Sequence, residues 1–250
     1  MAVIYPDYVA RFYDIIYASV RSVDRAYYLR KIAGCKGPVL EVGVGTGRFF
    51  LEALHAGADI YGIDPNESML RVLQQQLTAR QQHRVSLQSA ESLSLPVKFD
   101  LIIAPFRVFS HLITIDRQLT ALERIHQYLN ENGFFIFDLF VPNLKMLADG
   151  LHEHMDYEGE YEPGHMLRRI TSAHADVMNQ VNHVTMRYEW DENGKLQKHE
   201  WHFDMRYFFR WEIEHLIARS PLTLETIFGD YGENPLTDAS NDFVVMCRKK

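Results

Sequence analysis

The chain has 250 residues, of which 47% are hydrophobic and 24% are charged, as in a globular protein of one domain with an elaboration. Its formal net charge is -7 and it contains no run of Lys and Arg, so nucleic acid is not the expected partner. The two cysteines, Cys35 and Cys247, lie far apart and match no metal-ligand spacing, which argues against a disulfide framework and against a zinc site.

Neither a leader peptide nor a membrane span is visible in the sequence. The segment Met1–Tyr8 lacks the basic and apolar parts of a signal peptide. No apolar run reaches the ~18 residues that a membrane span needs. We therefore expect a cytoplasmic protein with no membrane contact.

The first part of the chain has the periodicity of two helices. Apolar residues recur at helical spacing, which predicts a helix over Tyr5–Tyr17. A second helical stretch runs from Val23 to Ala33. We expect residues 1–36 to form an N-terminal helical cap. The apolar positions of the first helix are Tyr5, Val9, Phe12 and Ile16.

A glycine-rich turn follows a predicted buried strand over residues 38–42. Gly43, Gly45 and Gly47 are spaced G-x-G-x-G ahead of a helix predicted from Thr46 to His55. Glycine permits positive φ and lets a ligand approach the backbone closely. Such a turn between a strand and a helix binds nucleotides in doubly wound α/β folds, although it is also a plain tight turn in other proteins. The full dinucleotide fingerprint and the phosphate-loop motif are both absent.

The second predicted strand, Asp59–Asp64, ends in an acidic residue 19 positions after Gly45. In nucleotide-binding α/β units, an acidic side chain at about this distance accepts hydrogen bonds from the ribose hydroxyls. An Asp in this position also suits the cap of the helix that follows Pro65. Ribose binding and helix capping are therefore the two interpretations of Asp64.

Three more strands complete the predicted central unit, residues 37–145. They are Val85–Gln88, Phe99–Ala104 and Phe134–Phe140, and a helix over Thr114–Leu129 with a stop at Asn132-Gly133 precedes the last. Strand Phe99–Ala104 is apolar almost throughout, as a strand covered on both faces should be. Ligands in open α/β sheets bind outside the carboxyl ends of the strands, which places the loop after Ala104 at the site.

The segment 146–208 differs in character and predicts an antiparallel β insertion. Asn193-Gly194 is a strong hairpin signal, and residues alternate between apolar and polar on both sides of it. Leu167–Thr171 predicts a third strand. The apolar face needs a cover, which the core, a substrate or a second subunit in a homodimer would each provide. Its alternating apolar residues are Val184, Met186, Tyr188, Trp190, Trp201, Phe203, Met205 and Tyr207.

The insertion also contains seven histidines, but their spacing is not typical of a metal site. We therefore predict no bound metal. The last segment, residues 209–250, returns to the core with a helix over Phe209–Arg219 and an antiparallel pair, Leu222–Phe228 and Phe243–Arg248. The seven histidines are His152, His154, His165, His174, His183, His199 and His202.

Several motifs, in the right order between Val39 and Phe140, resemble those of the class I S-adenosylmethionine-dependent methyltransferases of the small-molecule type. They are E-V-G-V-G-T-G from Glu41, A-P-F-R-x-x-x-H-L from Ala104 and N-G-F-F-I-F-D from Asn132. The N-terminal Y-D-x-x-Y pattern from Tyr13 is similar to that of a family helix that closes over the cofactor. The resemblance implies an α/β fold with a doubly wound, mostly parallel, seven-stranded Rossmann-like sheet and an antiparallel β insertion.

The resemblance further implies S-adenosylmethionine as the cofactor and in-line methyl transfer to an N, O or C atom of a small-molecule acceptor. Glu41 and the glycine turn would hold the methionine end, and Asp64 the ribose. Most members carry Asp where this chain has Glu91, so the backbone role at the adenine edge is clearer than the side-chain role. The implied cofactor residues are Glu41, Gly43, Gly45, Gly47, Asp64, Ala90, Glu91 and Ala104.

For the acceptor side, we predict contacts from the N-terminal helix, the loop after Ala104 and the insertion as a roof. His111 and Tyr13 are the candidates for chemistry, since the pKa of a histidine lies near neutrality. For His111 we favour a structural or substrate-contact role over that of general base, and Tyr13 is equally interpreted as a core aromatic. The predicted acceptor residues are Tyr13, Phe106, Arg107, His111, Tyr188, Trp201 and Arg206.

Two other functions share part of this evidence. A nicotinamide-dependent oxidoreductase has a similar strand, turn and acidic residue, but Arg48 follows Gly47 and the dinucleotide pattern is not met. A non-catalytic methyltransferase-like module would bind a nucleoside or a partner through its β face. Binding of NADH, or cofactor binding without turnover, would distinguish these from a methyltransferase.

Overall fold

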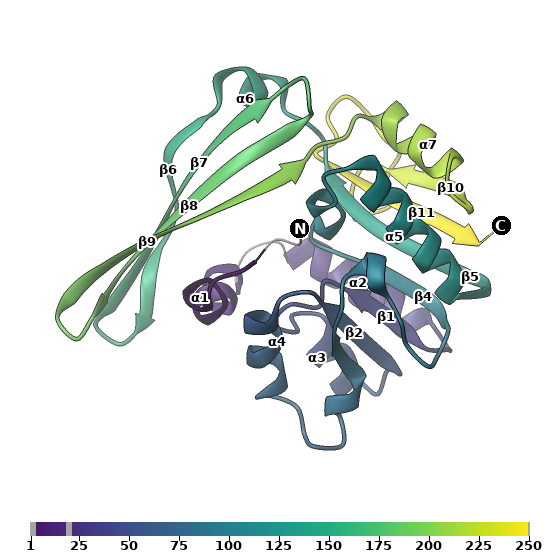
Figure 1. Ribbon diagram of the computed structural model, residues 1–250, viewed down its shortest axis with the longest axis horizontal. Helices are drawn as coiled ribbons and strands as arrows, with labels where there is room; N and C mark the ends of the chain where they lie inside the picture. Colours follow the sequence, from purple (N-terminus) through teal and green to yellow (C-terminus); the bar gives the residue numbers. More distant parts are fainter. Residues whose placement is uncertain (1–3, 19–21, 250) are drawn as a thin grey trace.

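The computed structural model describes residues 4–18 and 22–249, and within these ranges the strands form two sheets (Figure 1). Residues 1–3 and 19–21 of the predicted helical cap, and residue 250, lie outside the described residues. One sheet has seven strands in the order β10-β11-β5-β4-β1-β2-β3, and the other has four in the order β6-β7-β8-β9.

The seven-stranded sheet confirms the predicted α/β architecture. Strands β1 to β5 run parallel, whereas β11 is antiparallel to both of its neighbours, β5 and β10. Every residue of β1 is buried, because helices cover both faces of the sheet. The strands are β1 (Val39–Val42), β2 (Ile60–Asp64), β3 (Val85–Leu87), β4 (Phe99–Ala104), β5 (Leu129–Phe140), β10 (Leu222–Phe228) and β11 (Asp242–Lys249).

Alternate residues of one strand bury into two different cores. Ile102 of β4 packs with α5 (Ile115–Tyr128) and α7 (Arg210–Ala218) on one face of the sheet. Leu101 and Ile103 pack on the other face with α2 (Ser22–Gly34), α3 (Phe50–His55) and α4 (Glu67–Gln74). Short 3-10 turns η1 (Gln82–Arg84), η2 (Ala90–Ser92) and η3 (Val108–His111) join the elements, and α6 (Leu144–Asp149) leads out of the core.

Several helix boundaries differ from the prediction, and two of the differences have a clear physical cause. The helix after the glycine turn begins at Phe50 rather than at Thr46, because Gly47 has φ +94° and cannot continue a helix. Helix α5 ends at Tyr128, and its next residue, Leu129, is already extended. Asn132-Gly133 therefore lies within β5 instead of stopping the helix.

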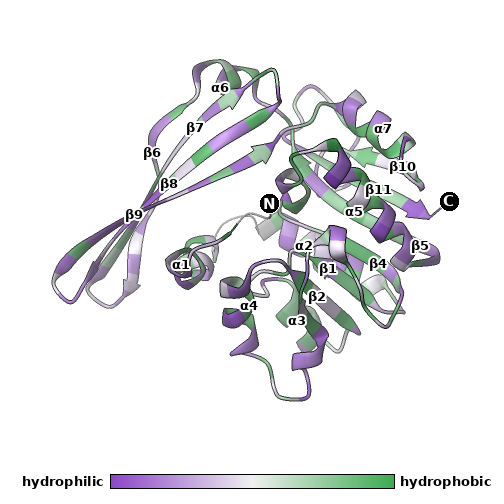
Figure 2. Cartoon of the chain, in the orientation of Figure 1, coloured by the Kyte–Doolittle hydropathy of each residue, from purple (hydrophilic) through white to green (hydrophobic). Residues whose placement is uncertain are grey.

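The insertion is a four-stranded antiparallel meander of β6 (Leu151–Glu162), β7 (His165–Asp176), β8 (Val181–Glu192) and β9 (Lys195–Arg206). The hairpin at Asn193-Gly194 is confirmed, with φ of +52° and +72° at the two turn residues. Strand β6 was not predicted, because it is an edge strand of mostly exposed residues and its sequence lacks a clear apolar face. Hydrophilic residues dominate the far turns of this sheet (Figure 2).

Helix α1 (Asp7–Tyr17) covers the apolar face of the insertion and lies between the two sheets (Figure 1). Phe12 is fully buried, with its ring centroid 5.2 Å from that of Trp190 and 5.1 Å from that of Tyr161. On its other side α1 contacts α4, where Ser68 donates to Asp7 at 2.5 Å. The cover of the β face is thus a helix of the same chain.

None of the described helices has the length and the apolar character to cross a bilayer.

We expect Phe12→Ala to lower the free energy of unfolding by about 3–5 kcal/mol, because it deletes a fully buried ring between α1 and the sheet. Urea denaturation followed by circular dichroism measures the loss. Leu144→Ala is the matched control, since Leu144 is 68% exposed and its truncation should change stability by less than about 0.5 kcal/mol. A loss below about 1 kcal/mol for Phe12→Ala would contradict the packing of α1.

Candidate functional site

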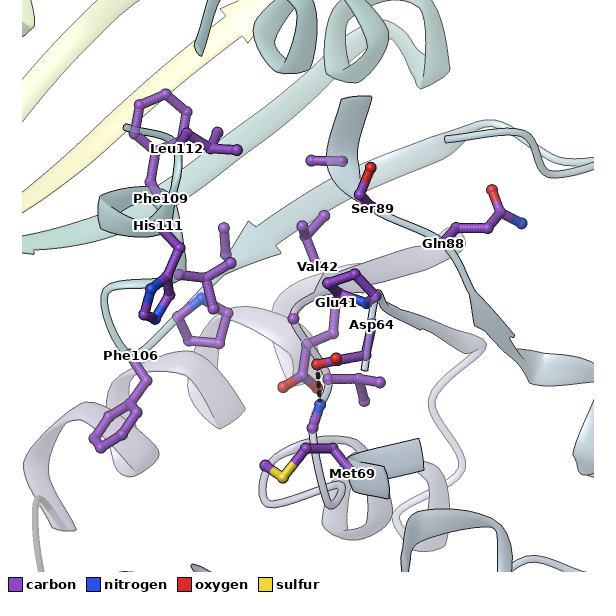
Figure 3. A pocket seen from close by; sticks show the side chains of 18 of the residues that line it. Glu41, Val42, Asp64, Met69, Gln88, Ser89, Phe106, Phe109, His111 and Leu112 are labelled. Carbon is purple, nitrogen blue, oxygen red and sulfur yellow. Dashed lines mark hydrogen bonds between the residues drawn. The ribbon is translucent and has the colours of Figure 1, made fainter. Parts of the chain in front are cut away.

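One cavity opens at the carboxyl ends of β1, β2 and β4, where the glycine turn, η2, η3 and α1 converge (Figure 3). This is the edge at which open α/β sheets bind ligands. The cavity brings together most of the predicted site residues, which are Tyr13, Glu41, Gly43, Gly45, Asp64, Ala90, Glu91, Ala104, Phe106 and His111.

The three glycines of the turn have different tasks. Gly43 has φ +74°, and a Cβ there would lie 2.4 Å from Val108, so glycine lets the turn and η3 approach each other. Gly45 lines the cavity with φ +55°. Gly47 does not line the cavity, and a Cβ there would lie 2.5 Å from Leu73 of α4. Its task is therefore the packing of helices behind the turn.

Asp64 ties the glycine turn to the start of α4. Its carboxylate accepts from the backbone N–H of Gly45 at 2.9 Å and from that of Asn66 at 2.8 Å. Burial raises the pKa of Asp64 to about 6, and the two backbone hydrogen bonds oppose that rise. Asn66, and not Asp64, caps α4, because its side chain accepts from the backbone N–H of Met69 at 3.1 Å. The helix-cap interpretation of Asp64 is thus wrong.

Glu41 ends β1 and is 1% exposed. It accepts a hydrogen bond from the backbone of Phe50, while its Oε2 has no partner among the described residues. Burial, followed by the nearby charge of Asp64, raises the pKa of Glu41 well above its usual range. A buried carboxylate oxygen without a donor costs free energy, and a ligand that brings a donor or a positive charge removes that cost.

The segment after β3 forms the opposite wall of the cavity. Ser89 and Ser92 cap the single turn of η2, and Ala90 is buried. Glu91 lines the cavity, but its carboxylate accepts from Arg117 of α5 at 2.7 Å. This ion pair already uses the Glu91 side chain, so the wall offers mainly its backbone and the small Ala90 side chain.

The loop after β4 is held by a buried acid of β5. Phe106 and Arg107 both have left-handed backbone conformations, with φ of +60° and +63°. Their N–H groups donate to Asp138 at 2.8 and 2.9 Å, and the Tyr28 hydroxyl donates to the same carboxylate at 2.7 Å. Sequence reasoning missed Asp138, although a lone acid within the apolar run F-F-I-F-D-L-F was a usable signal.

Arg107 points away from the cavity. Its guanidinium lies 3.4 Å from Asp242 of β11 and 5.2 Å from the centroid of the Phe140 ring. Phe106, the residue before it, does line the cavity. Arg107 is thus absent from the lining of the cavity, and its contact with an acceptor stays a prediction.

The three predicted roof residues do not line the cavity either. Tyr188 is buried beneath α1, with its ring 5.5 Å from that of Tyr8. The indole of Trp201 donates to the backbone of Ile4 at 2.9 Å. Arg206 pairs with Glu212 at 2.9 Å. Helix α1 separates the sheet from the cavity, and thus the sheet supports the roof without forming its inner surface.

Tyr5 and Tyr13 supply the inner surface of the roof. Their ring centroids lie 6.3 Å apart, and Tyr5 also packs at 4.4 Å against Trp201. Tyr13 continues through Tyr17 to Phe106 in a chain of ring contacts of 4.7 and 5.1 Å. Sequence reasoning assigned Tyr5 only to the apolar stripe of the helix, because its contact with Trp201 joins residues 196 positions apart.

Comparison with known proteins agrees with this geometry. Residues 39–133 match the family model described as methyltransferase domain. An uncharacterized methyltransferase from Bacillus thuringiensis (strain Al Hakam) is 33% identical over 101 residues, which are 40% of this chain and 46% of that protein. The chain therefore spans about half the length of the curated relatives that it matches.

Two solved structures share the fold over nearly the whole chain. An S-adenosylmethionine-dependent methyltransferase from Clostridium acetobutylicum ATCC 824 superposes with a TM-score of 0.74 at 16% identity, covering 97% of both chains. The sugar N-methyltransferase KedS8 from Streptoalloteichus sp ATCC 53650 gives 0.73 at 16% identity, covering 95% of this chain and 93% of that one. The chain thus has the fold of these S-adenosylmethionine-dependent methyltransferases, and its residues 39–133 are similar to the methyltransferase domain of the family model.

We expect Asp138→Asn to lower the free energy of unfolding by about 3 kcal/mol. A carboxylate has two acceptor oxygens and an amide only one, whereas the Tyr28 hydroxyl and the N–H groups of Phe106 and Arg107 all donate to this side chain. Urea denaturation at pH 7 measures this loss. Asp238→Asn is the control, since Asp238 is exposed and should tolerate the change. Equal stability of the two variants would show that the loop after β4 does not depend on the Asp138 carboxylate.

Proposed function

We propose that the protein transfers a methyl group from S-adenosylmethionine to a small-molecule acceptor. The observation that carries the proposal is the cavity that joins the glycine turn, two buried carboxylates of successive parallel strands and an aromatic wall. The methyltransferase domain found over residues 39–133 supports the same function.

The methionine end of the cofactor fits beside Glu41 and the turn. Glu41 Oε2 is buried and lacks a donor among the described residues, and an ammonium group supplies both a donor and a positive charge. Gly43 and Gly45 leave the adjacent backbone open to close approach. These residues would hold the amino acid part of the ligand.

The nucleoside part fits between β2 and η2. Each Asp64 oxygen accepts one backbone hydrogen bond and keeps lone pairs for the two hydroxyls of a ribose. Ala90 and the backbone around Glu91 would border the adenine, with Met69 on the side of α4. Ala104 at the exit of β4 would lie beside the transferred group.

When bound, S-adenosylmethionine supplies a methyl group on a positively charged sulfur that is a good leaving group. The task of the chain is then to position the acceptor in line with that methyl group, which lowers the barrier by about 7–11 kcal/mol in well-oriented cases. Tyr13, Phe106 and His111 are the predicted acceptor residues that line the cavity, and Tyr5 joins them.

A small molecule suits this mainly apolar cavity better than a polymer does. The similar structure from Streptoalloteichus is named a sugar N-methyltransferase, which supports a small-molecule acceptor. The net charge of -7 gives no reason to expect a nucleic acid.

Calorimetric titration with S-adenosylmethionine, S-adenosylhomocysteine and NADH tests the proposal. We expect micromolar affinity for the two adenosyl ligands and no binding of NADH. Binding of NADH alone would favour an oxidoreductase, whereas adenosyl binding without turnover on a broad acceptor panel would favour a non-catalytic module. If none of the three ligands binds, the assignment of the cavity as a cofactor site is wrong.

The affinity for S-adenosylhomocysteine should fall as the pH is lowered through about 6. Ribose hydroxyls donate to an ionised Asp64, and below its pKa of about 6 the carboxyl group must lose a proton before it binds. We expect the dissociation constant measured by calorimetry to rise about tenfold for each pH unit below 6.

Asp64→Asn should remove the part of this pH dependence that Asp64 contributes and weaken binding at pH 8 by about 10- to 100-fold, the equivalent of one or two hydrogen bonds to a charged group. Asp238→Asn should keep both the affinity and the slope. An unchanged affinity in Asp64→Asn would contradict the ribose assignment.

A further inference from the structure

A polar cluster lies within the mainly apolar contact between α1 and the four-stranded sheet. At its centre is Arg169 of β7, which is 5% exposed. Its Nε donates to Asp156 of β6 at 2.8 Å, and its Nη1 donates to the Tyr17 hydroxyl at 2.9 Å. The Thr171 hydroxyl donates to the second oxygen of Asp156, also at 2.8 Å. Arg169 therefore joins the sheet to the last residue of α1.

The planar guanidinium gives this link a fixed direction. Both hydrogen bonds come from one rigid group, so the position of Asp156 determines where Nη1 points. The guanidinium also lies over the Tyr17 ring, with Cζ 4.9 Å from the ring centroid. An apolar side chain in place of a buried ion pair is often equally stable, so stability alone does not account for an arginine here.

Tyr17 is a spacer between two rings of the cavity wall. Its ring centroid lies 4.7 Å from that of Tyr13 and 5.1 Å from that of Phe106. Tyr13 and Phe106 line the cavity, whereas Tyr17 does not. Because protein interiors are close-packed, a displacement of the Tyr17 ring also displaces the rings that it contacts.

This wall is anchored at both of its ends. The N–H of Phe106 donates to Asp138 of β5, which fixes the loop after β4. At the other end Tyr17 is the last residue of α1, and the ends of helices fray. The hydrogen bond from Arg169, 152 positions further along the chain, holds Tyr17 where the helix alone does not.

We propose that Arg169 is a positioning residue for the acceptor. Through the Tyr17 hydroxyl it sets the separation of Tyr13 and Phe106, and with it the width of the acceptor that the cavity takes. The inference rests on the proposed methyl transfer and assigns acceptor selectivity to a residue outside the site. Arg169 does not line the cavity, so it acts through Tyr17 and not by contact with an acceptor.

Two substitutions break the link, one from each side. Arg169→Met removes both hydrogen bonds and keeps an unbranched side chain. Tyr17→Phe removes only the hydroxyl and keeps the spacer ring, and this milder change keeps the test valid if Arg169→Met does not fold. Since both act on one link, we expect the double variant to behave as Arg169→Met alone does.

Tyr161→Phe is the matched control. The Tyr161 hydroxyl donates to the backbone carbonyl of Asp191, and the Tyr161 ring packs at 5.1 Å against Phe12 of α1. The substitution thus deletes a hydroxyl from the same interface between α1 and the sheet. Phe12 does not line the cavity, so this deletion leaves the spacer in place.

Fluorine NMR of the protein labelled with 3-fluorotyrosine tests the placement of Tyr13 without any ligand. The Tyr13 signal is identified by its loss in Tyr13→Phe. We expect Arg169→Met and Tyr17→Phe to shift this signal and Tyr161→Phe to leave it in place. An unshifted Tyr13 signal in both link variants would overturn the inference.

Turnover gives the second test, with formation of S-adenosylhomocysteine measured on paired one-ring and two-ring phenols and amines. We expect Arg169→Met to lower kcat/KM for the preferred member of a pair by about 10- to 100-fold, the cost of a misplacement of about 1 Å, and the other member to lose less. The KM for S-adenosylmethionine should stay within about threefold of the wild-type value, because Arg169 acts on the acceptor wall. A merely structural role would instead lower turnover of both members by the same factor.

The outcomes separate the two proposals. An unchanged preference between one-ring and two-ring acceptors in Arg169→Met, with S-adenosylhomocysteine bound as in the wild type, would overturn the inference and leave methyl transfer standing. Failure of the wild-type protein to bind either adenosyl ligand would overturn the proposed function. The fluorine signal of Tyr13 would then still decide whether Arg169 positions that ring.

Discussion

The two hydrogen bonds that Asp64 accepts, from Gly45 and from Asn66, fix the distance between the turn after β1 and the helix after β2. Parallel strands end at one edge, so the groups that shape a site there come from separate crossovers and need a direct link. Asp138 does the same for the loop after β4, through Phe106, Arg107 and Tyr28. Buried carboxylates thus determine the shape of the cavity rim. The backbone there has positive φ angles, which residues other than glycine rarely adopt.

These acids are not equally satisfied, and the difference separates structure from ligand binding. Both oxygens of Asp138 accept donors from the chain, as a structural acid requires. Glu41 keeps one buried oxygen without a partner among the described residues, and its raised pKa reflects the loss of water and the closeness of Asp64. In the free protein this arrangement costs stability, and natural proteins tolerate such costs mainly at functional sites. A ligand with an ammonium, a sulfonium and a diol would supply a donor to the unpaired Glu41 oxygen and a positive charge beside the two neighbouring carboxyl groups.

Most of the core was predictable, because its signals are local. Apolar strands, the glycine turn and the 19-residue spacing from Gly45 to Asp64 follow from short-range constraints of a strand–helix–strand unit. The roof was not predictable in the same way. Tyr188 and Trp201 belong to the alternating apolar face of the sheet, and Arg206 lies outside that alternation, but only the packing of α1 decides whether that face meets a ligand. Strand β6 was missed because an exposed edge strand carries no apolar pattern.

Helix α1 explains how the four-stranded sheet helps to shape the site, although none of its residues lines the cavity. Successive residues of a helix point about 100° apart, so that Phe12 is buried against Trp190 of the sheet while Tyr13 lines the cavity. Arg169 of β7 donates to the Tyr17 hydroxyl at 2.9 Å, and the Tyr17 ring lies between Tyr13 and Phe106. The sheet therefore sets the position of this wall of the cavity by holding α1 from behind. Changes in the sheet would therefore move the side chains of Tyr5 and Tyr13, and also that of His111, whose ring centroid lies 6.0 Å from that of Phe203 of β9.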